Sequence, residues 1–456
     1  MAIRTNSNKV EKGDTFVALR GEVTDGHLYI RQAIEAGASR IVCMEGNYDE
    51  VETVVVPDTY TYLRQLLKEE YYDAIQDLRL IGVTGTNGKT TITYLLYQAL
   101  NQLGIKTSYI GTIGFYLDDQ VEQLERTTPQ IEEVYEMLYR SKQKGVTTVV
   151  MEVSSHALKL NRLDYLNFDF AIFTNLTEDH LDFHKTFDDY LHAKQKLFYK
   201  MKENGLAILN ADDPYCSSMI NQENENILYG YHKSSSYRVK KRQLDLYGTK
   251  FQVSHDGINF MIETSLLGEF NISNLLSVVI VLDKMGFSME EIQKTVKELT
   301  PPPGRMDLVP YRNNVIVVDY AHTPDAVFQL LFLAKQLTNH KIYSIIGCGG
   351  NRDREKRRIM AKYATTLSDF VIMTSDNPRN EDPELILKDM SKALYKDNFM
   401  KVIDRKEAIQ KGISLLTCGD LLLILGKGHE SYQIIGSETF YHNDKDFVLQ
   451  YIDRLN

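Results

Sequence analysis

The strongest chemical signal in the sequence is a glycine-rich segment, Gly82-Val-Thr-Gly85-Thr-Asn-Gly88-Lys89-Thr90-Thr91. It follows an apolar run, Leu80–Thr84, and precedes a helical pattern, Thr91–Leu103. Glycines let backbone N–H groups turn toward phosphate oxygens, and a helix N-terminus adds the positive end of its dipole. The lysine can pair with the β- and γ-phosphates of a nucleotide, and the next threonine can bind Mg²⁺. The segment therefore predicts a nucleotide phosphate site, with Val83 where the generic G-x-x-x-x-G-K pattern has glycine.

Two further polar segments follow strand-like runs and could complete a metal site. Glu152 ends the run Thr148–Val153, and His180 comes shortly after the run Phe168–Thr174. A carboxylate at the carboxyl end of a strand, in a sheet with a phosphate loop, is well placed for Mg²⁺. A histidine such as His180 is by itself more typical of a solvated or core residue than of a ligand. Its position directly after a second sheet strand favours the ligand role.

Alternating strands and helices are needed to hold these residues together. Residues up to about Asp77 form one small α/β unit, and a second begins with the strand before the phosphate loop. Its strands alternate with helical patterns at Ile131–Lys142 and Phe187–Lys202, which is typical of a parallel sheet with crossover helices. The run Thr300-Pro-Pro-Pro-Gly304 excludes both helix and central strand, so it marks a boundary.

The last third of the chain has the most regular alternation of strands and helices. Strands are predicted at 315–320, 342–347, 370–374, 401–404 and 421–425, with helices such as 326–336 between them. This pattern indicates a doubly wound domain, and such sheets bind ligands beyond the carboxyl ends of their strands. We therefore expect an α/β protein of three domains, at residues 1–78, 79–302 and 303–456. The polar segments at the expected binding edge are Asp319–His322, Gly347–Arg354, Asp376–Arg379 and Gly426–Glu430.

Composition narrows the class of protein. The 456 residues are 43% hydrophobic and 25% charged, which are ordinary values for a globular chain. With 52 basic and 62 acidic side chains the net charge is −10, so we expect no nucleic-acid partner and a local site for any phosphate. No apolar run is long enough to span a membrane, and the N-terminus shows no secretion signal. The four cysteines lack metal or disulfide spacing, so all four are expected to be buried and reduced in the cytoplasm.

Taken together, these segments resemble the Mur ligases, ATP-dependent enzymes that add amino acids to the peptidoglycan precursor. The similarity is to the tripeptide-synthetase (MurE-type) branch and covers nearly the whole chain in order. It implies an N-terminal UDP-substrate-binding domain, a central ATPase domain and a C-terminal Rossmann-like domain that binds the incoming amino acid. The matching segments are TGTNGKTT (84–91), EVSSHAL (152–158), TNLTEDHLDFH (174–184), DYAHTPD (319–325), GCGGNRDREKR (347–357), SDNPR (375–379) and GKGHE (426–430).

The resemblance also implies a reaction and its substrates. ATP phosphorylates the terminal carboxylate of UDP-N-acetylmuramoyl-L-alanyl-D-glutamate (UDP-MurNAc-dipeptide), and an amino acid then attacks the acyl phosphate. Family members that add meso-diaminopimelate carry the segment DNPR, here residues 376–379. Arg379 can bind the distal carboxylate of meso-diaminopimelate through two parallel hydrogen bonds. A simple Asn-Pro turn is the alternative explanation for that segment. ATP and Mg²⁺ are the implied cofactors of what is expected to be a cytoplasmic monomer with no membrane partner.

Residue by residue, the resemblance places candidate site residues in this sequence. The catalytic set is Lys89, Glu152, His180 and Lys194, the last carbamoylated by CO₂. By sequence alone Lys194 is a helix-surface lysine, and Lys196 would be as good a choice. The implied metal ligands are Thr90, Glu152, His180 and carbamoylated Lys194. The implied ATP site comprises Gly85, Thr86, Asn87, Gly88, Lys89, Thr90, Thr91, Asn271, Asn274, Arg305, Asp319 and His322. The implied sugar-peptide site comprises Ser7, Thr127, Thr128, Ser154 and Arg162. The implied amino-acid site comprises Arg352, Asp376, Asn377, Pro378, Arg379, Gly426 and Glu430.

Several positions depart from the family pattern. Family members usually carry a further N-terminal segment that helps to hold uracil, and here Asn6-Ser7-Asn8 stands for the usual Asp-Ser-Arg. Leu160 replaces a common glutamine, Asn351 an aspartate and Glu355 a glycine. These changes spare the ATP and amino-acid sites, so a paralogue that uses a different acyl acceptor stays open as an alternative. A folylpolyglutamate- or cyanophycin-synthetase-like ligase and a nucleotide-binding regulator without turnover are two others. DNPR and GKGHE argue against the ligase, and the intact catalytic set argues against the regulator.

Overall fold

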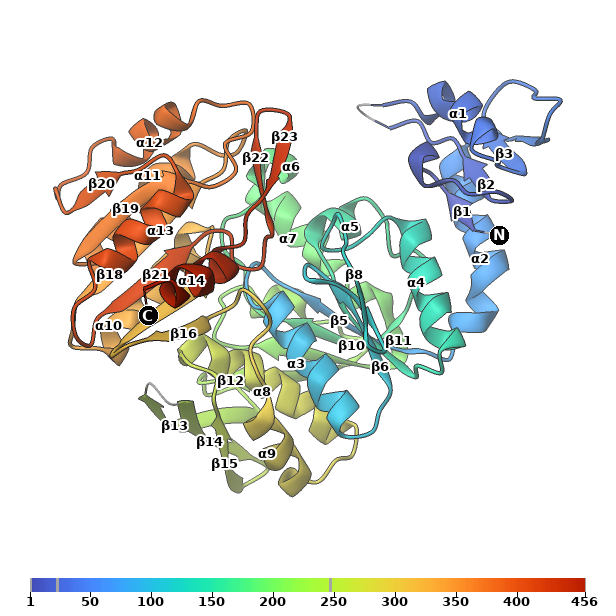
Figure 1. Ribbon diagram of the computed structural model, residues 1–456. Helices are drawn as coiled ribbons and strands as arrows, with labels where there is room; N and C mark the ends of the chain where they lie inside the picture. Colours follow the sequence, from blue (N-terminus) through green and yellow to red (C-terminus); the bar gives the residue numbers. More distant parts are fainter. Residues whose placement is uncertain (1, 22–23, 246–247, 456) are drawn as a thin grey trace.

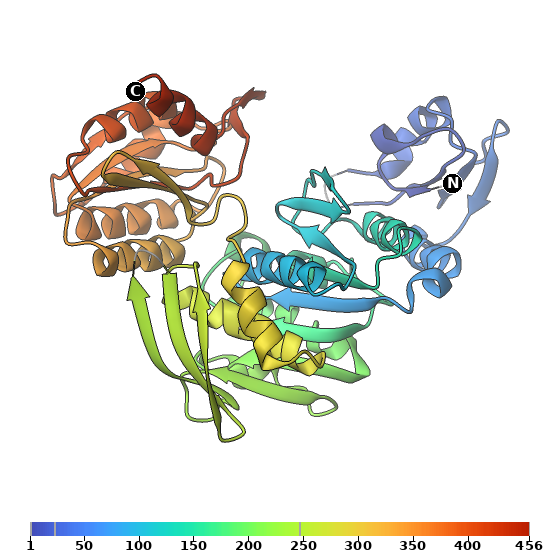
Figure 2. The same ribbon diagram turned by 60° about the horizontal axis from the view of Figure 1, so that its bottom comes forward.

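The computed structural model describes residues 2–21, 24–245 and 248–455 and arranges them around three main sheets. Figures 1 and 2 show these sheets as separate lobes, with the largest between the other two. The N-terminal sheet is parallel, the central one is mixed and the C-terminal one is mostly parallel. The α/β class predicted from the sequence is therefore confirmed.

The N-terminal lobe is a four-stranded parallel sheet with its own small core. Its strands are β1 (Ile3–Arg4), β2 (Thr15–Val17), β3 (Arg40–Cys43) and β4 (Glu52–Val55), in that spatial order. Helix α1 (Ile30–Glu35) packs on it, and Phe16, Ile30 and Ile41 are buried together. Helix α2 (Thr59–Ile75), which begins where the Asp58 side chain accepts a hydrogen bond from the Tyr60 N–H, leads into the central lobe.

The central sheet has eleven strands and is parallel only in its middle. The parallel strands are β6 (Thr107–Gly111), β9 (Thr148–Glu152), β5 (Arg79–Thr84), β10 (Phe168–Phe173), β11 (Met201–Asn210) and β12 (Glu225–Gly230), in spatial order. Antiparallel pairs extend the sheet at both edges. At one edge β7 (Gly114–Leu117) and β8 (Gln120–Glu122) follow β6. At the other, β13 (Tyr237–Asp245) still runs parallel to β12, and β14 (Gly248–His255) and β15 (Ile258–Thr264) then add antiparallel pairs. The prediction of a simple parallel sheet was wrong at these edges. Antiparallel strands need only one covered face, and in β14 only Thr249, Phe251 and Val253 are buried.

Helices cover both faces of the parallel strands. On one face α3 (Lys89–Gln102), α8 (Glu269–Lys284) and α9 (Met289–Glu298) pack over Ile81 and Val83 of β5. On the other face α2, α4 (Ile131–Gln143) and α7 (Phe187–Gln195) share a core with Leu80 and Met151. The helix predicted to reach residue 202 ends early, because Leu197 and Phe198 are buried in that core and the chain turns there into β11.

The C-terminal lobe is a six-stranded sheet covered on both faces. Its strands are β16 (Asp307–Tyr311), β17 (Asn314–Asp319), β21 (Leu421–Leu425), β18 (Ile342–Cys348), β19 (Phe370–Ser375) and β20 (Phe399–Lys401), in spatial order, and only β16 is antiparallel. One face carries α10 (Pro324–Leu337), α11 (Glu355–Leu367) and α12 (Pro383–Ser391), and the other α13 (Arg405–Ser414) and α14 (Asp444–Asp453). A hairpin, β22 (Tyr432–Ile435) and β23 (Glu438–Tyr441), lies beside the sheet. The strand predicted at 401–404 ends at Lys401, because Asp404 caps α13.

Two further expectations concern membranes and cysteines. None of the helices in the described ranges is long and apolar enough to cross a membrane. Cys43, Cys216 and Cys348 are buried free thiols, but Cys418 is exposed, so the expectation that all four are buried was wrong. Cys418 lies in the short loop between α13 and β21, which the sheet does not cover.

Candidate active site

The glycine-rich segment forms a tight loop between β5 and α3. Gly85 and Gly88 have φ angles of 148° and 90°, in a region that L-residues rarely adopt. A Cβ atom on Gly85 would stand 1.8 Å from Oγ1 of Thr174, and one on Gly88 would stand 2.6 Å from Oδ1 of Asn274. No side chain caps the start of α3, which begins at Lys89, two residues earlier than predicted. A close-fitting loop before an uncapped helix N-terminus suits a phosphate group.

Lys89 and Thr90 lie at the start of this helix with their polar groups directed inward. Nζ of Lys89 donates hydrogen bonds to the carbonyl oxygens of Gly85 and Thr86, each at 2.9 Å. Burial lowers the pKa of Lys89, although nearby carboxylates, Glu152 first, oppose this. The hydroxyl of Thr90 donates to Oε2 of Glu152 at 3.0 Å. An anion beside the lysine would offset the cost of burying its charge.

Glu152 ends β9 and is fully buried. Its Oε1 accepts hydrogen bonds from the Tyr109 hydroxyl at 2.7 Å and the Thr112 N–H at 2.8 Å. Its Oε2 accepts from the Thr112 hydroxyl at 3.1 Å, in addition to Thr90. Tyr109 and Thr112 come from the end of β6 and the turn that follows it. No local signal in the sequence identified either residue, because the contact depends on β6 lying next to β9.

His180 lies after β10 in a left-handed conformation, with φ of 54°. Its Nε2 is 3.4 Å from Oδ2 of Asp179, whose carboxylate also pairs with Lys356 of the C-terminal lobe. Burial lowers the pKa of His180 to about 4, with Asp179 opposing the shift. The imidazole is therefore neutral at pH 7, which is the form that can bind a metal.

The residues predicted to bind Mg²⁺ do not form a closed ligand cluster of their own. Among residues 2–21, 24–245 and 248–455, no three His, Cys, Asp or Glu side chains converge so that they alone could hold a metal ion. Mg²⁺ usually binds one or two carboxylates together with waters and substrate phosphates, so it does not require such a cluster. Glu152 and Thr90 at the phosphate loop fit an ion that is shared with a nucleotide.

Lys194 is buried on α7 and reaches the same loop. Its Nζ donates to the carbonyl oxygen of Gly85 at 2.7 Å and lies 4.6 Å from the centre of the Tyr190 ring. Burial, with the charge of Lys89, brings the pKa of Lys194 well below its ordinary value. The surface position expected from the sequence was therefore wrong. Lys196 points elsewhere, since its Nζ donates to the carbonyl of Leu158 at 3.3 Å.

A cavity of about 630 Å³ opens over the phosphate loop, between the central and C-terminal lobes. Its volume lies within the usual range for a small-molecule site. Asn271 and Asn274 line it from α8, where Nδ2 of Asn274 donates to Oδ1 of Asn271 at 3.0 Å. The predicted residues that line it are Thr86, Asn87, Gly88, Lys89, Thr90, Thr91, Thr127, Glu152, His180, Asn271, Asn274, Arg305, Asp319 and His322.

The C-terminal lobe contributes one wall of this cavity. The guanidinium of Arg305 lies 4.7 Å from the centre of the Tyr320 ring, and its Nε is buried without a partner among the described residues. Asp319 fixes the backbone on both sides of this wall. Its carboxylate accepts hydrogen bonds from the N–H groups of Met306, next to Arg305, and Ala321, each at 2.7 Å. Nδ1 of His322 lies 2.9 Å from the carbonyl oxygen of Tyr320.

The sugar-peptide candidates of the central lobe lie next to Glu152. The Thr128 hydroxyl donates to the backbone carbonyl of Glu152 at 2.7 Å and accepts from the N–H of Ser154 at 3.0 Å. A guanidinium nitrogen of Arg162 donates to the Thr128 carbonyl at 3.0 Å. The Thr127 hydroxyl accepts a hydrogen bond from the Thr112 hydroxyl at 3.1 Å.

Ser7 lies apart from this group, in the N-terminal lobe. It is buried, and its hydroxyl donates to Oε1 of Gln32 at 3.0 Å. None of its contacts described here involves the central lobe. Leu160, where the family commonly has glutamine, is half exposed at the end of α5 (Ser155–Lys159).

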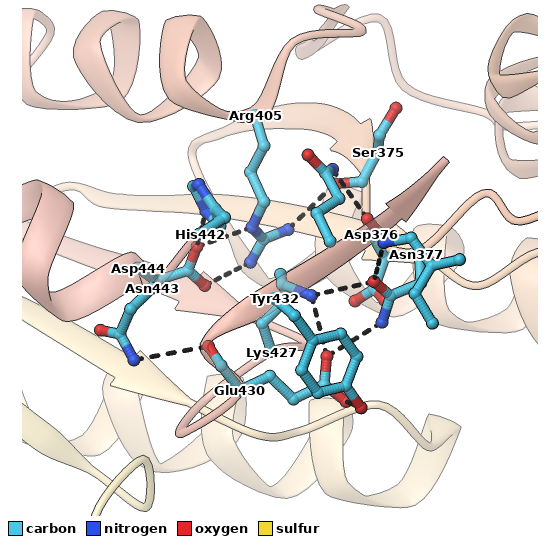
Figure 3. Close-up of polar contacts among 12 residues, drawn as sticks. Ser375, Asp376, Asn377, Arg405, Lys427, Glu430, Tyr432, His442, Asn443 and Asp444 are labelled. Atoms are coloured by element: carbon cyan, nitrogen blue, oxygen red, sulfur yellow. Dashed lines mark hydrogen bonds and ion pairs between the residues drawn. The ribbon is translucent and has the colours of Figure 1, made fainter. Parts of the chain in front are cut away.

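The amino-acid candidates form a second cluster at the carboxyl ends of β19 and β21 (Figure 3). Nδ2 of Asn377 donates to Oε2 of Glu430 at 2.9 Å. Lys427 is fully buried between them, with its Nζ 2.8 Å from Oε2 of Glu430 and 3.2 Å from Oδ1 of Asn377. A Cβ atom on Gly426 would stand 2.7 Å from Oδ2 of Asp376. The sequence did not single out Lys427.

Arg379 follows Pro378 at the edge of this cluster, with φ of 52°. Its guanidinium donates to the carbonyl oxygens of Gly350 and Asn377, at 2.9 and 3.4 Å. Within the described ranges these are its only hydrogen-bond acceptors, and no carboxylate pairs with it, so it can still bind an anion. Its backbone pairs with the β22–β23 hairpin through the carbonyl of Ile434. Arg352 is exposed nearby, and neither arginine lines the 630 Å³ cavity.

The fold and the site define an α/β phosphate-loop enzyme with a separate Rossmann-like lobe. Three family models match consecutive parts of the chain: "Mur ligase family, catalytic domain" at residues 2–71, "Mur ligase middle domain" at 83–282 and "Mur ligase, glutamate ligase domain" at 304–428. Curated relatives match over almost the full length. The UDP-N-acetylmuramoyl-L-alanyl-D-glutamate--2,6-diaminopimelate ligase of Clostridium tetani is 38% identical over 99% of this chain and 95% of its own. That of Bacillus cereus is 38% identical over 100% and 94%. The chain belongs to the Mur ligase family.

Solved structures show the same architecture. A structure of a UDP-N-acetylmuramoyl-L-alanyl-D-glutamate--2,6-diaminopimelate ligase matches with a TM-score of 0.68 and 32% identity, over 100% of this chain and 95% of that one. A MurF ligase from Thermotoga maritima, in complex with ADP, matches with a TM-score of 0.72 over 99% and 97%. Its identity is 19%, so the likeness concerns the fold alone.

Proposed function

We propose that this chain is an ATP-dependent ligase that adds meso-diaminopimelate to UDP-N-acetylmuramoyl-L-alanyl-D-glutamate in peptidoglycan synthesis. The observation that supports this most is the 38% identity, over nearly the whole length, to the diaminopimelate ligases of C. tetani and B. cereus. The proposed domains are residues 1–78 for the UDP substrate, 79–302 for ATP and 303–456 for the amino acid. We propose that the enzyme works as a monomer in the cytoplasm.

The nucleotide half of the reaction rests on the phosphate loop. The γ-phosphoryl group of ATP passes to the terminal carboxylate of the dipeptide, forming an acyl phosphate and ADP. Lys89 would leave its loop carbonyls for the phosphate oxygens and follow the charge that moves with them. Arg305, whose Nε lacks a partner among the described residues, would bind phosphate from the opposite wall. Mg²⁺, held by Thr90, Glu152, His180 and carbamoylated Lys194 together with the phosphates, would supply further charge neutralisation.

The amino-acid half rests on the cluster at β19 and β21. The neutral amine of diaminopimelate attacks the acyl carbon, a C–N bond forms, and the C–O bond to phosphate breaks. Arg379 would bind the distal carboxylate of the amino acid in a bidentate fork. Lysine lacks that carboxylate, so it would leave the guanidinium without an anion, and the site should reject it.

The direct test is amino-acid-dependent phosphate release from ATP with purified UDP-MurNAc-dipeptide. Wild-type protein should turn over with meso-diaminopimelate and much more slowly with lysine. A second series replaces the acyl acceptor, because a paralogue would use diaminopimelate with a different acceptor. No phosphate release with the dipeptide and any amino acid would refute the proposal.

Replacing Arg379 with alanine should lower kcat/KM for diaminopimelate by about ten- to a hundred-fold. The change removes a charged hydrogen-bond donor, while lysine, which never used it, should lose far less. The gap between the two amino acids should therefore narrow without making a good lysine enzyme, because nothing new binds the ammonium group. The measurement is kcat/KM for both amino acids, with exposed Arg354→Ala as the matched control. Equal use of both by the wild type would mean that DNPR is only a turn.

A further inference from the structure

Arg405 is a fully buried arginine that none of the roles above uses. It is the first residue of α13, on the face of the C-terminal sheet opposite to α10 and α11. Its side chain is completely enclosed, together with that of Asp444. Burying an arginine is costly unless every part of its fork has a partner. Its partners are therefore informative.

Two of these partners are backbone carbonyls at the sheet's carboxyl edge. One guanidinium nitrogen of Arg405 donates to the carbonyl oxygen of Leu425 at 3.0 Å, and the other donates to that of Ser375 at 3.3 Å. Ser375 is the last residue of β19, directly before Asp376, and Leu425 is the last residue of β21, directly before Gly426. Both segments of the amino-acid cluster therefore begin at a carbonyl that Arg405 holds.

The sheet itself does not join these two ends. In spatial order β18 lies between β21 and β19, so no ladder hydrogen bond connects them. Arg405 spans this separation with one planar group. Figure 3 shows the guanidinium between Asp444 and Ser375. A guanidinium can do so because its donors have a fixed fork geometry, whereas an ammonium group is a point charge.

Asp444, the first residue of α14, fixes the arginine from the other side. Its carboxylate accepts from Nε and a terminal nitrogen of Arg405, at 2.8 and 2.6 Å, and lies 2.8 Å from Nε2 of His442. Burial alone would lower the pKa of Arg405, but the charge and hydrogen bonds of Asp444, with smaller contributions from Asp376 and Glu430, raise it. The pKa of Asp444 is held far below its ordinary value, against the effect of burial, by the same pair and by His442. Both groups stay charged at neutral pH.

We propose that Arg405, held by Asp444, is a positioning residue for the incoming amino acid: it sets the spacing between the Asp376–Arg379 and Gly426–Glu430 segments. This rests on the proposed function of the same cluster. The contacts between the segments, such as Asn377 to Glu430, form only when both loops start from the right place. Arg405 is completely enclosed and does not line the 630 Å³ cavity, so it would act only through these two segments.

The test is steady-state kinetics of Arg405→Lys with diaminopimelate and ATP varied separately. Lysine keeps the cation for Asp444 but cannot reach both carbonyls. KM for diaminopimelate should rise about ten-fold or more, while KM for ATP stays within about two-fold. Discrimination against lysine as substrate should also fall, because Arg379 loses its placement. KM does not depend on how much of the enzyme is folded, so partial unfolding would lower only the apparent kcat.

The matched control is Ile409→Val, which removes a buried methyl group from the same helix without touching either carbonyl. It should leave both KM values unchanged. If Arg405→Lys does not fold, the same KM measurements on Asp444→Asn test the inference, because this change removes the charge that holds the Arg405 guanidinium in place. An unchanged KM for diaminopimelate in a folded variant of either kind would overturn the inference. Absence of diaminopimelate-dependent turnover in the wild type would instead refute the proposed function.

Discussion

Replacing Lys89 with alanine should lower kcat for phosphate release by about a hundred- to a thousand-fold. Lys89 is the half-buried lysine of the phosphate loop, where its only hydrogen-bond acceptors within the described ranges are two backbone carbonyls. In the reaction it would stabilise charge on the moving phosphoryl group, and no other group on the loop can replace it. Measuring kcat and KM for ATP under saturating diaminopimelate checks this.

The loss should not come from unfolding. Burial already lowers the pKa of Lys89, so its charge is costly to the folded protein and its removal should not reduce the melting temperature. Lys106→Ala is the matched control, because Lys106 is a half-exposed lysine of the same lobe. It should keep full activity. Near-normal turnover by Lys89→Ala would mean that the loop does not bind the phosphates of ATP.

Replacing Lys194 with alanine should abolish most activity, by at least about a hundred-fold, with partial rescue by formate or acetate. Burial lowers the pKa of Lys194 well below its ordinary value, which favours the neutral amine, the form that reacts with CO₂. A carbamate would be an anion beside Lys89 and Mg²⁺, where an ammonium group would be repelled. The small carboxylate would restore the missing oxygen ligand. The measurement is kcat with and without added carboxylate, and in buffer depleted of CO₂.

Lys196→Ala provides the comparison, since it lies two residues further on and donates to Leu158 instead of the phosphate loop. Its activity should stay close to that of the wild type. An active Lys194→Ala enzyme, or wild-type activity that is indifferent to CO₂, would rule out the carbamate.

The sequence and the structure disagree most clearly where a contact spans separate elements. Lys194, in α7, and Lys196, just after its end, have similar neighbours in the chain, yet one is buried against Gly85 and the other is not. Helix α7 also stops sooner than its pattern predicts, because Leu197 and Phe198 enter the core. A helical pattern specifies a face, but the depth of a residue on that face depends on what packs against it.

Short sequence motifs were sufficient to predict the structure where it depends only on neighbouring residues in the chain. The loop from Gly85 to Gly88 needs positive φ angles and a helix directly after it, and both follow from residue types at adjacent positions. The α/β class, the strand before the loop and the break at the three prolines are local in the same sense. Their physical origin is backbone conformation and the period of apolar residues, which a linear sequence displays directly.

The arrangement around the site could be decided only by tertiary structure. Glu152 owes its fixed carboxylate to Tyr109 and Thr112 on a neighbouring strand. Arg405 connects strand ends that are 50 residues apart, Ser375 and Leu425, across an intervening strand. Strand order and the depth at which a side chain is buried result from the packing of the whole chain. Neither can be inferred from the residue type at a single position. For that reason the motifs indicated which chemistry to expect, whereas the folded chain determined which side chains hold it in place.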